Sequence, residues 1–541
     1  MKLVLLTLAA AASTCFAADL FPVAGTILNA GTNSPLPHAY VFFYPSAGAK
    51  LAASSVTGED GRFRFELPAG SYRLLAGTRD VQESYGTHAT GSAFGSAVIV
   101  GPGQDTSRLA IRFFVPGAIT GRIVDESGEP VEQALVQLVR STTVAGKRTA
   151  AVLAYERTDD RGQYRFGHLP GGVQYYLAVT GNPWYSRGNL EDAPGAQAAA
   201  AYAPVYYPDT NDPSRATPIS LASGQEARAD FRLTAVPNAT ITVKYSAPAG
   251  LQGTIGLTSD GVAGTSAFQV SQQLSVPAFA VQPDAARQGP QLTATLQSIP
   301  PGHYTLRMLG AVSGNAFGAT VPVDVNGSNA TVNLDLRPFS KIEGTVHLPP
   351  AAVTKTPLVA SVRGSVSGAV GTVAVRADGT FSFPNVEPGR YRVAVAGTGF
   401  FTSGLEVRDG GTLKDGLVEV PELTTVRVSV TVSDLVGRVK GIVDDGQGPV
   451  AGALVVISSV PGQTVRPGGE EIHQGYQTES DGSFVFSEPA GRYLLFAVDN
   501  SDLEYMEPKA LVPYLSRSGE VEIQAGATAE KKIPLLPPAT N

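Results

Sequence analysis

The stretch Asp60-Gly61-Arg62-Phe63-Arg64-Phe65, continued by Leu67-Pro68-Ala69-Gly70-Ser71-Tyr72, decides the fold of this 541-residue chain because it recurs. Related stretches stand at 160–175, 378–391 and 481–493. Each contains an acidic residue and a glycine, then two aromatic residues separated by a single residue, then a turn with proline or glycine, and finally a tyrosine. We call this pattern the turn–aromatic motif. A repeated pattern of this kind indicates several copies of one small domain.

The residues of the motif have structural reasons to be there. Asp-Gly predicts a tight hairpin turn, because glycine accepts a positive φ and the Asp side chain bonds nearby backbone N–H groups. We expect Asp60, Asp160, Asp378 and Asp481 to form these turns. Phe63 and Phe65 alternate with charged residues, as period 2 requires of a strand with one buried face. The tyrosine after the second turn is expected to pack inward and to bond a turn carbonyl through its hydroxyl.

The first unit reads as seven short strands rich in β-branched or aromatic residues and bounded by turn formers. A unit of this kind predicts a β-sandwich. The expected strands are Val23–Leu28, Tyr40–Tyr44, Leu51–Gly58, Arg62–Leu67, Ser71–Thr78, Ser96–Gly101 and Ser107–Phe114.

A second phrase marks the start of the units. Pro35-Leu36-Pro37-His38-Ala39-Tyr40-Val41 is matched at 130–136 and 449–455, each time after a strand that carries a glycine. The fourth unit keeps only the glycine strand, Glu343-Gly344-Thr345-Val346, and the third is the most divergent copy. The chain is therefore divided into a signal peptide at 1–18 and sandwiches at 19–115, 116–235, 236–338, 339–433 and 434–541.

Together these phrases resemble the carboxypeptidase regulatory-like domain, a prealbumin-like seven-stranded sandwich, and its relatives the Cna B-type repeats of bacterial surface proteins. The resemblance implies an all-β fold, a tandem array of about five Ig-like or prealbumin-like sandwiches. It also implies an accessory, stalk, adhesive or glycan-associated role in an exported bacterial protein. The motif residues are turn formers and core aromatics, so they specify the fold and not a function.

The N-terminus has the pattern of an export signal, with Lys2, an apolar stretch from Leu3 to Ala12, and a cleavage site before Ala18 or Asp19. Cys15 is the only cysteine, so the mature chain has none unless Cys15 itself is the lipid-modified N-terminus. We expect an exported protein, located in the periplasm, on the outer surface or outside the cell.

The composition excludes several classes of function. The net charge is −7 and no cluster of Lys and Arg exists to bind phosphates, so nucleic acid is not an expected partner. No second apolar run is long enough to predict a transmembrane helix. The chain is expected to be a monomer whose partner is a polysaccharide or another surface protein.

No catalytic or metal-binding pattern stands out. The six histidines are spread without ligand spacing, and Asp209, Asn211 and Asp212 lack the bidentate Glu of a calcium loop. No serine nucleophile elbow of the Gly-x-Ser-x-Gly type lies between a strand and a helix. We therefore predict no catalytic residues, no metal, no cofactor and no enzymatic activity.

The second unit has an unusual insertion at 182–217 that contains the only tryptophan. Aromatic rings on a surface can stack on pyranose faces, so the insertion predicts a ligand-binding site, with a sugar as its ligand. The alternative is that the rings cap the sandwich or join units two and three. The candidate residues are Trp184, Tyr185, Tyr202, Tyr206 and Tyr207.

The leading functional hypothesis is a non-enzymatic stalk or adhesion protein in which the sandwiches supply length and stiffness. The alternatives are a carbohydrate-binding protein that uses the insertion and, more remotely, an accessory part of a polysaccharide- or peptide-degrading system.

Overall fold

The computed structural model of the chain describes residues 19–78, 81–86, 95–144, 146–183, 200–262, 265–267, 269–276, 291–350, 357–364, 371–460, 472–500 and 503–537. The predicted signal peptide with Cys15 lies outside the described residues. The described part is almost entirely β-strand, with one α-helix, α1 (Pro508–Leu515). Within that part, no helix has the length and apolarity needed to cross a bilayer.

Sandwich 1 consists of two facing sheets around one core. In the first sheet, β1 (Leu20–Asn29) pairs antiparallel with β4 (Arg62–Pro68) and parallel with β8 (Leu109–Phe113). The second has the order β3 (Ala53–Val56), β2 (Tyr40–Pro45), β5 (Gly70–Gly77), β6 (Gln82–Ser84), with β7 (Ala97–Val100) also on β5. The seven predicted strands are confirmed, and β6 is an additional one.

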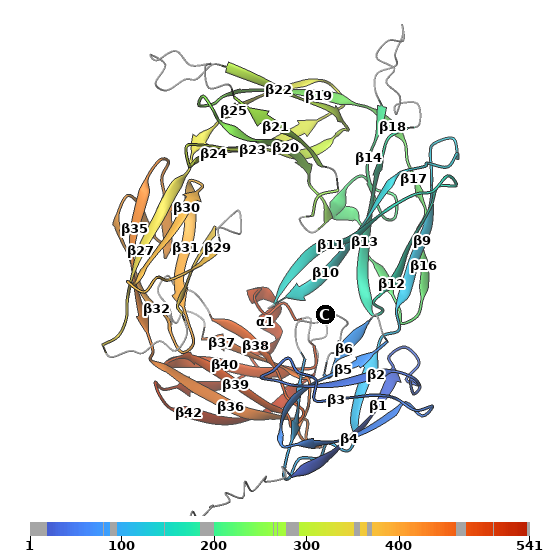
Figure 1. The fold of residues 1–541 in the computed structure, drawn as a ribbon, viewed down its shortest axis with the longest axis vertical. Helices are drawn as coiled ribbons and strands as arrows, with labels where there is room; N and C mark the ends of the chain where they lie inside the picture. Colours follow the sequence, from blue (N-terminus) through green and yellow to red (C-terminus); the bar gives the residue numbers. More distant parts are fainter. Residues whose placement is uncertain are drawn as a thin grey trace, which may run out of the picture.

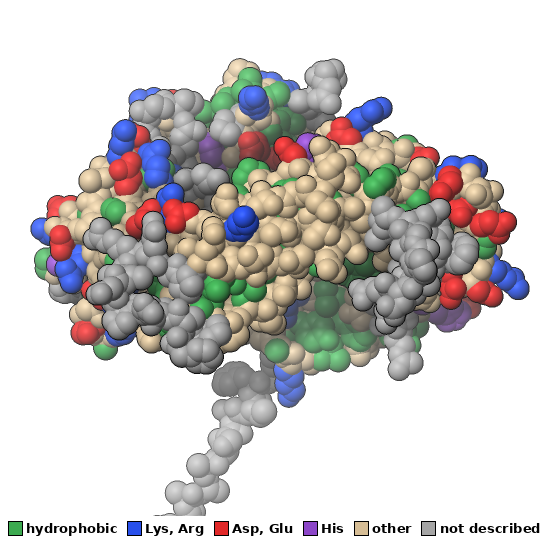
Figure 2. All heavy atoms as spheres, turned by 90° about the horizontal axis from the view of Figure 1, so that it is seen from above, with side chains coloured by type: hydrophobic (Ala, Val, Ile, Leu, Met, Phe, Trp, Pro, Cys, Tyr) green, Lys and Arg blue, Asp and Glu red, His purple; other side chains and the backbone are tan. Residues whose placement is uncertain are grey.

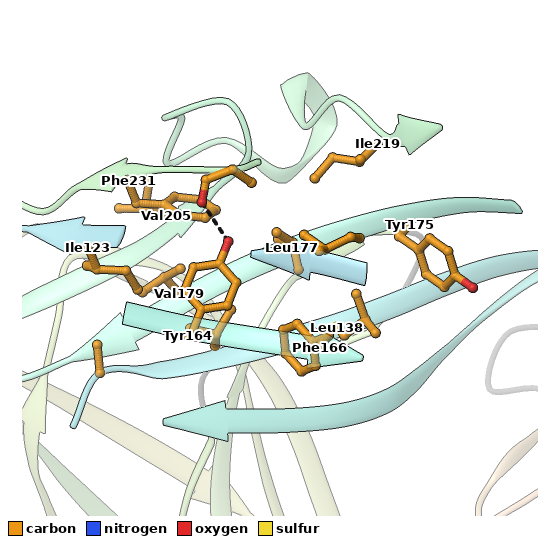
Figure 3. Packing of buried hydrophobic residues seen from close by; sticks show 14 of the residues in the cluster. Ile123, Leu138, Tyr164, Phe166, Tyr175, Leu177, Val179, Val205, Ile219 and Phe231 are labelled. Atoms are coloured by element: carbon orange, nitrogen blue, oxygen red, sulfur yellow. Dashed lines mark hydrogen bonds between the residues drawn. The ribbon is translucent and has the colours of Figure 1, made fainter. Parts of the chain in front are cut away.

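Related arrangements return four more times along the chain, so the predicted all-β tandem array is confirmed. In sandwich 5 the two layers are joined into one sheet, because β40 also pairs with β42. Sandwich 2 joins the sheet of β9 (Gly117–Val124), β12 (Gln163–Leu169), β16 (Glu226–Arg228) and β17 (Phe231–Arg232) to that of β10 (Leu135–Val144), β11 (Lys147–Arg157), β13 (Val173–Gly181), β14 (Ala200–Tyr206), β15 (Ile219–Leu221) and β18 (Ala235–Pro237). Its core is drawn in Figure 3. Sandwich 3 joins β19 (Ala239–Ser246), β22 (Gln291–Ile299) and β25 (Ala330–Asp335) to β20 (Gln252–Ser259), β21 (Gln269–Ser275), β23 (Gly302–Val312), β24 (Asn315–Val325) and β26 (Arg337–Pro338).

Sandwich 4 joins β27 (Ser340–His347), β30 (Thr380–Val386), β32 (Phe401–Asp409) and β35 (Thr425–Ser433) to β28 (Val359–Gly364), β29 (Gly371–Ala374), β31 (Gly389–Ala396), β33 (Thr412–Lys414) and β34 (Leu417–Val420). Sandwich 5 joins β36 (Val436–Asp444), β39 (Ser483–Pro489) and β42 (Thr528–Leu536) to β37 (Leu454–Ser459), β38 (His473–Gln477), β40 (Gly491–Val498) and β41 (Gly519–Ile523). The exact boundaries of the five units stay a prediction.

In sandwiches 1, 2, 4 and 5, a glycine of the first strand lies under an aromatic ring of the neighbouring strand. Gly25 is opposite Phe63, and Gly121 is opposite Tyr164, in the antiparallel register. Gly344 and Gly441 are opposite Phe381 and Phe484 in the same way. A Cβ on Gly25 would stand 2.6 Å from the Cζ atom of Phe63, which is closer than packed atoms allow. The glycine is therefore needed because the ring of its partner fills the space above it.

Sandwich 3 reverses this pair. Val243 occupies the glycine position, and its antiparallel partner is Ala294. A large residue on β19 is thus matched by a small one on β22, which conserves the volume between the two strands. This exchange explains why the motif is hardest to recognise in the third unit.

The predicted tyrosine corner is confirmed in all five sandwiches. Each hydroxyl donates a hydrogen bond to a carbonyl of the turn four or five residues earlier, at 2.7 to 3.0 Å. The rings themselves are buried, so each corner fixes the turn before the strand to the core. The five residues are Tyr72, Tyr175, Tyr304, Tyr391 and Tyr493.

The Asp-Gly turns have the expected local geometry but a different place in the topology. Gly61, Gly379 and Gly482 have positive φ, and the preceding Asp side chains accept backbone hydrogen bonds. These turns do not close hairpins, because the strands that they join, such as β3 and β4, belong to opposite sheets.

In sandwich 2 the turn-forming aspartate is not Asp160, as the sequence suggested. The carboxylate of Asp159 accepts hydrogen bonds from the backbone N–H groups of Arg161 and Gln163, at 3.0 and 2.7 Å. The reason is that Gly162 has an arginine directly before it, so the acceptor is supplied from earlier in the turn.

A buried threonine before the turn holds the second sequence phrase in place. The Thr158 hydroxyl donates to the Val131 carbonyl at 2.6 Å and accepts from the Ala134 N–H at 2.9 Å. Thr57 and Thr478 make the equivalent bonds in sandwiches 1 and 5. Sandwich 4 has Val375 at this position and also lacks the phrase, so the two features occur together.

The five sandwiches follow one another around a closed ring (Figure 1). The sheets that contain β10, β20, β28 and β37 lie toward its centre, and those that contain β9, β19, β27 and β36 lie outside (Figure 1). Sandwich 5 returns to sandwich 1, where it contacts β7, although the two are farthest apart in sequence. Viewed from the side of sandwich 3, the surface is mostly uncharged, with acidic and basic side chains intermixed at the flanks (Figure 2).

We expect Gly121→Ala to destabilise sandwich 2 by about 1–3 kcal/mol, the usual cost of overpacking a core. The added Cβ would overlap both the Ala229 carbonyl and the Tyr164 ring. Hydrogen exchange followed by mass spectrometry should show faster exchange in β9 and β12. Gly256→Ala is the matched control, because its Cβ would meet no atom closer than 3.6 Å. Equal effects of the two changes would contradict the proposed role of the glycine.

Candidate functional site

The predicted insertion of sandwich 2 is partly regular structure. It contributes β14, which pairs with β13 and β18, and a short helical turn, Pro213–Arg215, capped by the Asp212 side chain. Trp184 and Tyr185 lie outside the described residues. The structure therefore places only Tyr202, Tyr206 and Tyr207 of the candidate site.

These three tyrosines are not gathered on one exposed surface. Tyr202 is 3% exposed and belongs to the core of sandwich 2. Tyr206 is 2% exposed and packs in a different cluster. Tyr207 is half-buried, and its ring packs edge-on against Phe231 with a centroid distance of 6.2 Å.

Tyr206 joins sandwiches 2 and 3. Its ring packs with Ala178 and Val262, and its hydroxyl donates to the Asp260 carbonyl at 3.0 Å. Burial raises the pKa of the Tyr206 hydroxyl to about 12. The amide of Gln137 adds a second contact, donating to the Ser266 carbonyl at 2.8 Å. Two of the described tyrosines thus have packing roles within and between sandwiches.

The contact between sandwiches 5 and 1 is made by backbone and short polar side chains. The Ser480 N–H donates to the Ala97 carbonyl at 2.9 Å, and the Ser480 hydroxyl accepts from the Ile99 N–H at 2.9 Å. The Glu479 carboxylate accepts from the Ala97 N–H, and the Ser96 hydroxyl donates to the Thr478 carbonyl at 2.7 Å. The residues before the Asp-Gly turn of sandwich 5 thus form hydrogen bonds with backbone groups along one edge of β7. These bonds close the ring.

Sandwich 5 also reaches sandwich 2. The Met506 N–H donates to the Gly146 carbonyl at 3.0 Å, and Gly146 lies directly against the ring of Tyr505. Tyr505 belongs to an apolar cluster in which α1 covers β37 and β40, with Phe496 and Tyr514 stacked at 5.3 Å. Helix α1 was not expected. The signal in the sequence is the unbroken apolar run Ala453 to Ile457, most of which forms β37, a strand that is buried on both faces.

A cleft of about 980 Å³ lies between sandwiches 3 and 4. One side is the face of the β20, β21, β23 and β24 sheet that points away from the core of sandwich 3, and Glu387 to Tyr391 of sandwich 4 form the other. The Arg307 guanidinium on β23 is ion-paired with Glu387 across this junction. Sequence reasoning did not single out the cleft, because its residues are small hydroxyl side chains that also suit an ordinary exposed strand.

No group of three or more potential metal ligands occurs among the described residues. His303 forms an exposed ion pair with Asp324, with 2.6 Å between Nδ1 and Oδ1. The hydrogen bond that the imidazole donates to the Asp324 carboxylate raises the pKa of His303 above its ordinary value. This pair lies on the β23–β24 hairpin, where His303 is directly opposite Asp324.

Comparison with known proteins gives structural matches alone. No protein-family model matches the chain, and no curated protein matches its sequence. The TIE protein of Bacillus anthracis is 11% identical over 77% of this chain and 75% of that one, with a TM-score of 0.16. A streptococcal ancillary pilin is 14% identical over 59% of this chain and 99% of the pilin (TM-score 0.18). The minor pilin GBS52 of Streptococcus agalactiae is 12% identical over 40% and 97% (TM-score 0.21). At these TM-scores the matches carry no argument about what this chain binds or does.

We expect the stability of the chain to fall as the pH rises from about 10 to about 12. Burial raises the pKa of Tyr175 and Tyr391 to about 12, whereas an unfolded tyrosine has a pKa of about 10. Since the folded state holds these protons more tightly, the stabilisation is complete below pH 10 and is lost as the pH passes through the folded pKa. Denaturant unfolding at several pH values measures this loss. Tyr175→Phe should lower stability at pH 7 and flatten its alkaline decline, and an unchanged slope would contradict the assignment.

Proposed function

We propose that this chain is an exported, non-enzymatic structural protein of the adhesion type, built from carboxypeptidase regulatory-like sandwiches. The family proposal is supported by the turn–aromatic motif, the glycine strand and the parallel pairing of first and last strands in each sandwich. The non-enzymatic role is supported by the way the motif residues are used. They form turns, cores and corners, and none of them forms a catalytic arrangement.

The observation that carries the proposal is the closed ring. Direct contacts join sandwich 1 to 2, 2 to 3, 3 to 4 and 5 to 1. Sandwich 4 continues into sandwich 5 through a two-residue link between β35 and β36. A ring holds its surfaces at fixed positions and orientations, which suits a scaffold that presents binding surfaces to a partner outside the cytoplasm. The structure differs here from the expected stalk, because closure of the ring prevents the sandwiches from adding length in one direction.

Carbohydrate binding by the insertion is the second candidate function. Tyr202 and Tyr206 do not support it, because their rings are buried. The hypothesis now depends on Trp184 and Tyr185, which lie outside the described residues, and on Tyr207, which is half-buried.

Ring closure is tested by small-angle X-ray scattering of residues 19–541. We expect the scattering of a compact ring with low density at its centre. The double change Glu479→Ala, Ser480→Ala removes side-chain acceptors for the N–H groups of Ala97 and Ile99, so the radius of gyration should increase. Glu522→Ala, at an exposed position on β41, is the control and should leave the curve unchanged. Scattering of an extended rod by the unmodified chain would contradict the scaffold proposal.

Export is tested by producing the whole chain with its own N-terminus in a bacterium. We expect the protein outside the cytoplasm, with a mature N-terminus at Ala18 or Asp19, as determined by mass spectrometry. A lipid-modified chain that begins at Cys15 would identify the alternative anchor. An uncleaved chain in the cytoplasm would overturn the proposed location.

A further inference from the structure

We propose that the cleft between sandwiches 3 and 4 binds a neutral oligosaccharide. The ligand would lie on the face of β20, β21 and β23 that points away from the core of sandwich 3. This site is separate from the insertion of sandwich 2 and goes beyond the scaffold function. With a volume of about 980 Å³, the cleft is in the upper part of the range of small-ligand sites.

The floor of the cleft presents hydroxyl groups in a regular pattern. Thr254 and Thr258 project from β20, and Thr258 is directly opposite Thr305 of β23. Ser271 of β21 lies on the same side, opposite Gly256. A hydroxyl both donates and accepts hydrogen bonds, as does each hydroxyl of a sugar, so the two kinds of group are matched in chemistry.

Gly256 at the centre of the floor is not explained by packing. Its neighbours Ile255 and Leu257 are fully buried, so Gly256 faces the cleft. A Cβ there would meet only the Val270 carbonyl oxygen at 3.6 Å and the Ser271 Cβ at 3.7 Å, which are ordinary contacts. Glycine weakens a strand interior, and where no neighbour requires it, it can mark the close approach of a ligand. Because Gly256 has no side chain, the floor of the cleft is open between Thr254 and Thr258.

The charges around the cleft favour a neutral ligand. Four charged residues line the cleft. Arg307 is paired with Glu387, Arg390 lies 3.4 Å from Asp415 and 4.0 Å from Glu419, and Asp260 interacts electrostatically with His303. These arginines are therefore compensated and do not form an anion site. Tyr391 lines the cleft but is only 3% exposed, so binding depends on hydrogen bonds and not on ring stacking.

An extended peptide fits the floor less well than a sugar. Peptides that add to a sheet pair with free backbone groups at its edge. In the cleft floor, β20 is paired on both sides, with β21 and β23, and β23 is also paired with β24. The backbone groups of β20 and β23 are thus already used, and at the centre of the floor only side chains remain to bind a ligand; the edge of β21 that pairs with no described strand lies at the border of the sheet.

The test is isothermal titration calorimetry of residues 19–541 with cello-, malto-, xylo-, manno- and chitohexaose. We expect binding of at least one of them, and Gly256→Val should weaken it at least tenfold by filling the floor. Valine is favoured in strands, so the melting temperature should be retained. Thr258→Val, which removes one hydroxyl at nearly constant shape, should also weaken binding. Thr293→Val, at an exposed position on β22, is the control and should change neither the binding nor the melting temperature.

The possible outcomes separate this site from the other hypotheses. Binding that survives Gly256→Val and Thr258→Val overturns the proposal, and loss with Trp184→Ala alone places the sugar in the insertion. Binding of none of the five hexasaccharides, or of extended peptides instead, also overturns it. If the cleft does not bind sugar, the proposals that the sandwiches form a closed ring and that the chain is exported are unaffected. Scattering and N-terminal analysis test those two proposals independently.

Discussion

The pairing of a glycine on the first strand with an aromatic ring on the adjacent strand is the constraint on which four of the five sandwiches depend. The ring enters the core over the glycine, and the last strand runs parallel along the other side of the same strand. Gly121 and Gly441 are closed in from both directions, by a ring and by the carbonyl of Ala229 or Lys531. Where the partner strand carries an aromatic ring, the first strand can therefore be central in its sheet only if no side chain projects from this position. The exchange to Val243 and Ala294 in sandwich 3 shows that the constraint is one of volume across the pair.

The ends of the motif connect the two sheets. The Asp-Gly turn takes the chain from the inner sheet to the outer one, and the tyrosine corner takes it back. The threonine before the turn satisfies two buried backbone groups of the second phrase, in sandwiches 1, 2 and 5. The same turn region has a further use in sandwich 5, where Thr478 to Ser480 bond to β7 of sandwich 1. One local structure thus serves both the fold of a unit and the closure of the ring.

Much of the fold could be predicted from sequence because it depends on local patterns. Alternation in β4 and positive φ at Gly61 follow from residues close together in the chain. The candidate binding residues were harder to place. Tyr202 and Tyr206 occur in a polar, proline-rich insertion that suggests an exposed loop, yet β14 pairs with β13 and buries both rings. The hydroxyls of the proposed cleft were missed because Thr254 and Thr258 are ordinary residues for a wet sheet face, and only the neighbouring sandwich makes that face part of a cleft.

The sequence by itself determined the repeated unit, its all-β class, its turns and its tyrosine corners, because each of these depends on the chemistry of a few consecutive residues. Only the tertiary structure decided that the units form a ring. The contacts of Ser480 with Ala97 and of Tyr505 with Gly146 join segments hundreds of residues apart through backbone groups and small side chains. Every residue has those backbone groups, so their pairing across such distances has no signature in the sequence. The turn–aromatic motif therefore specifies the sandwich, and the contacts between sandwiches specify which surfaces face one another.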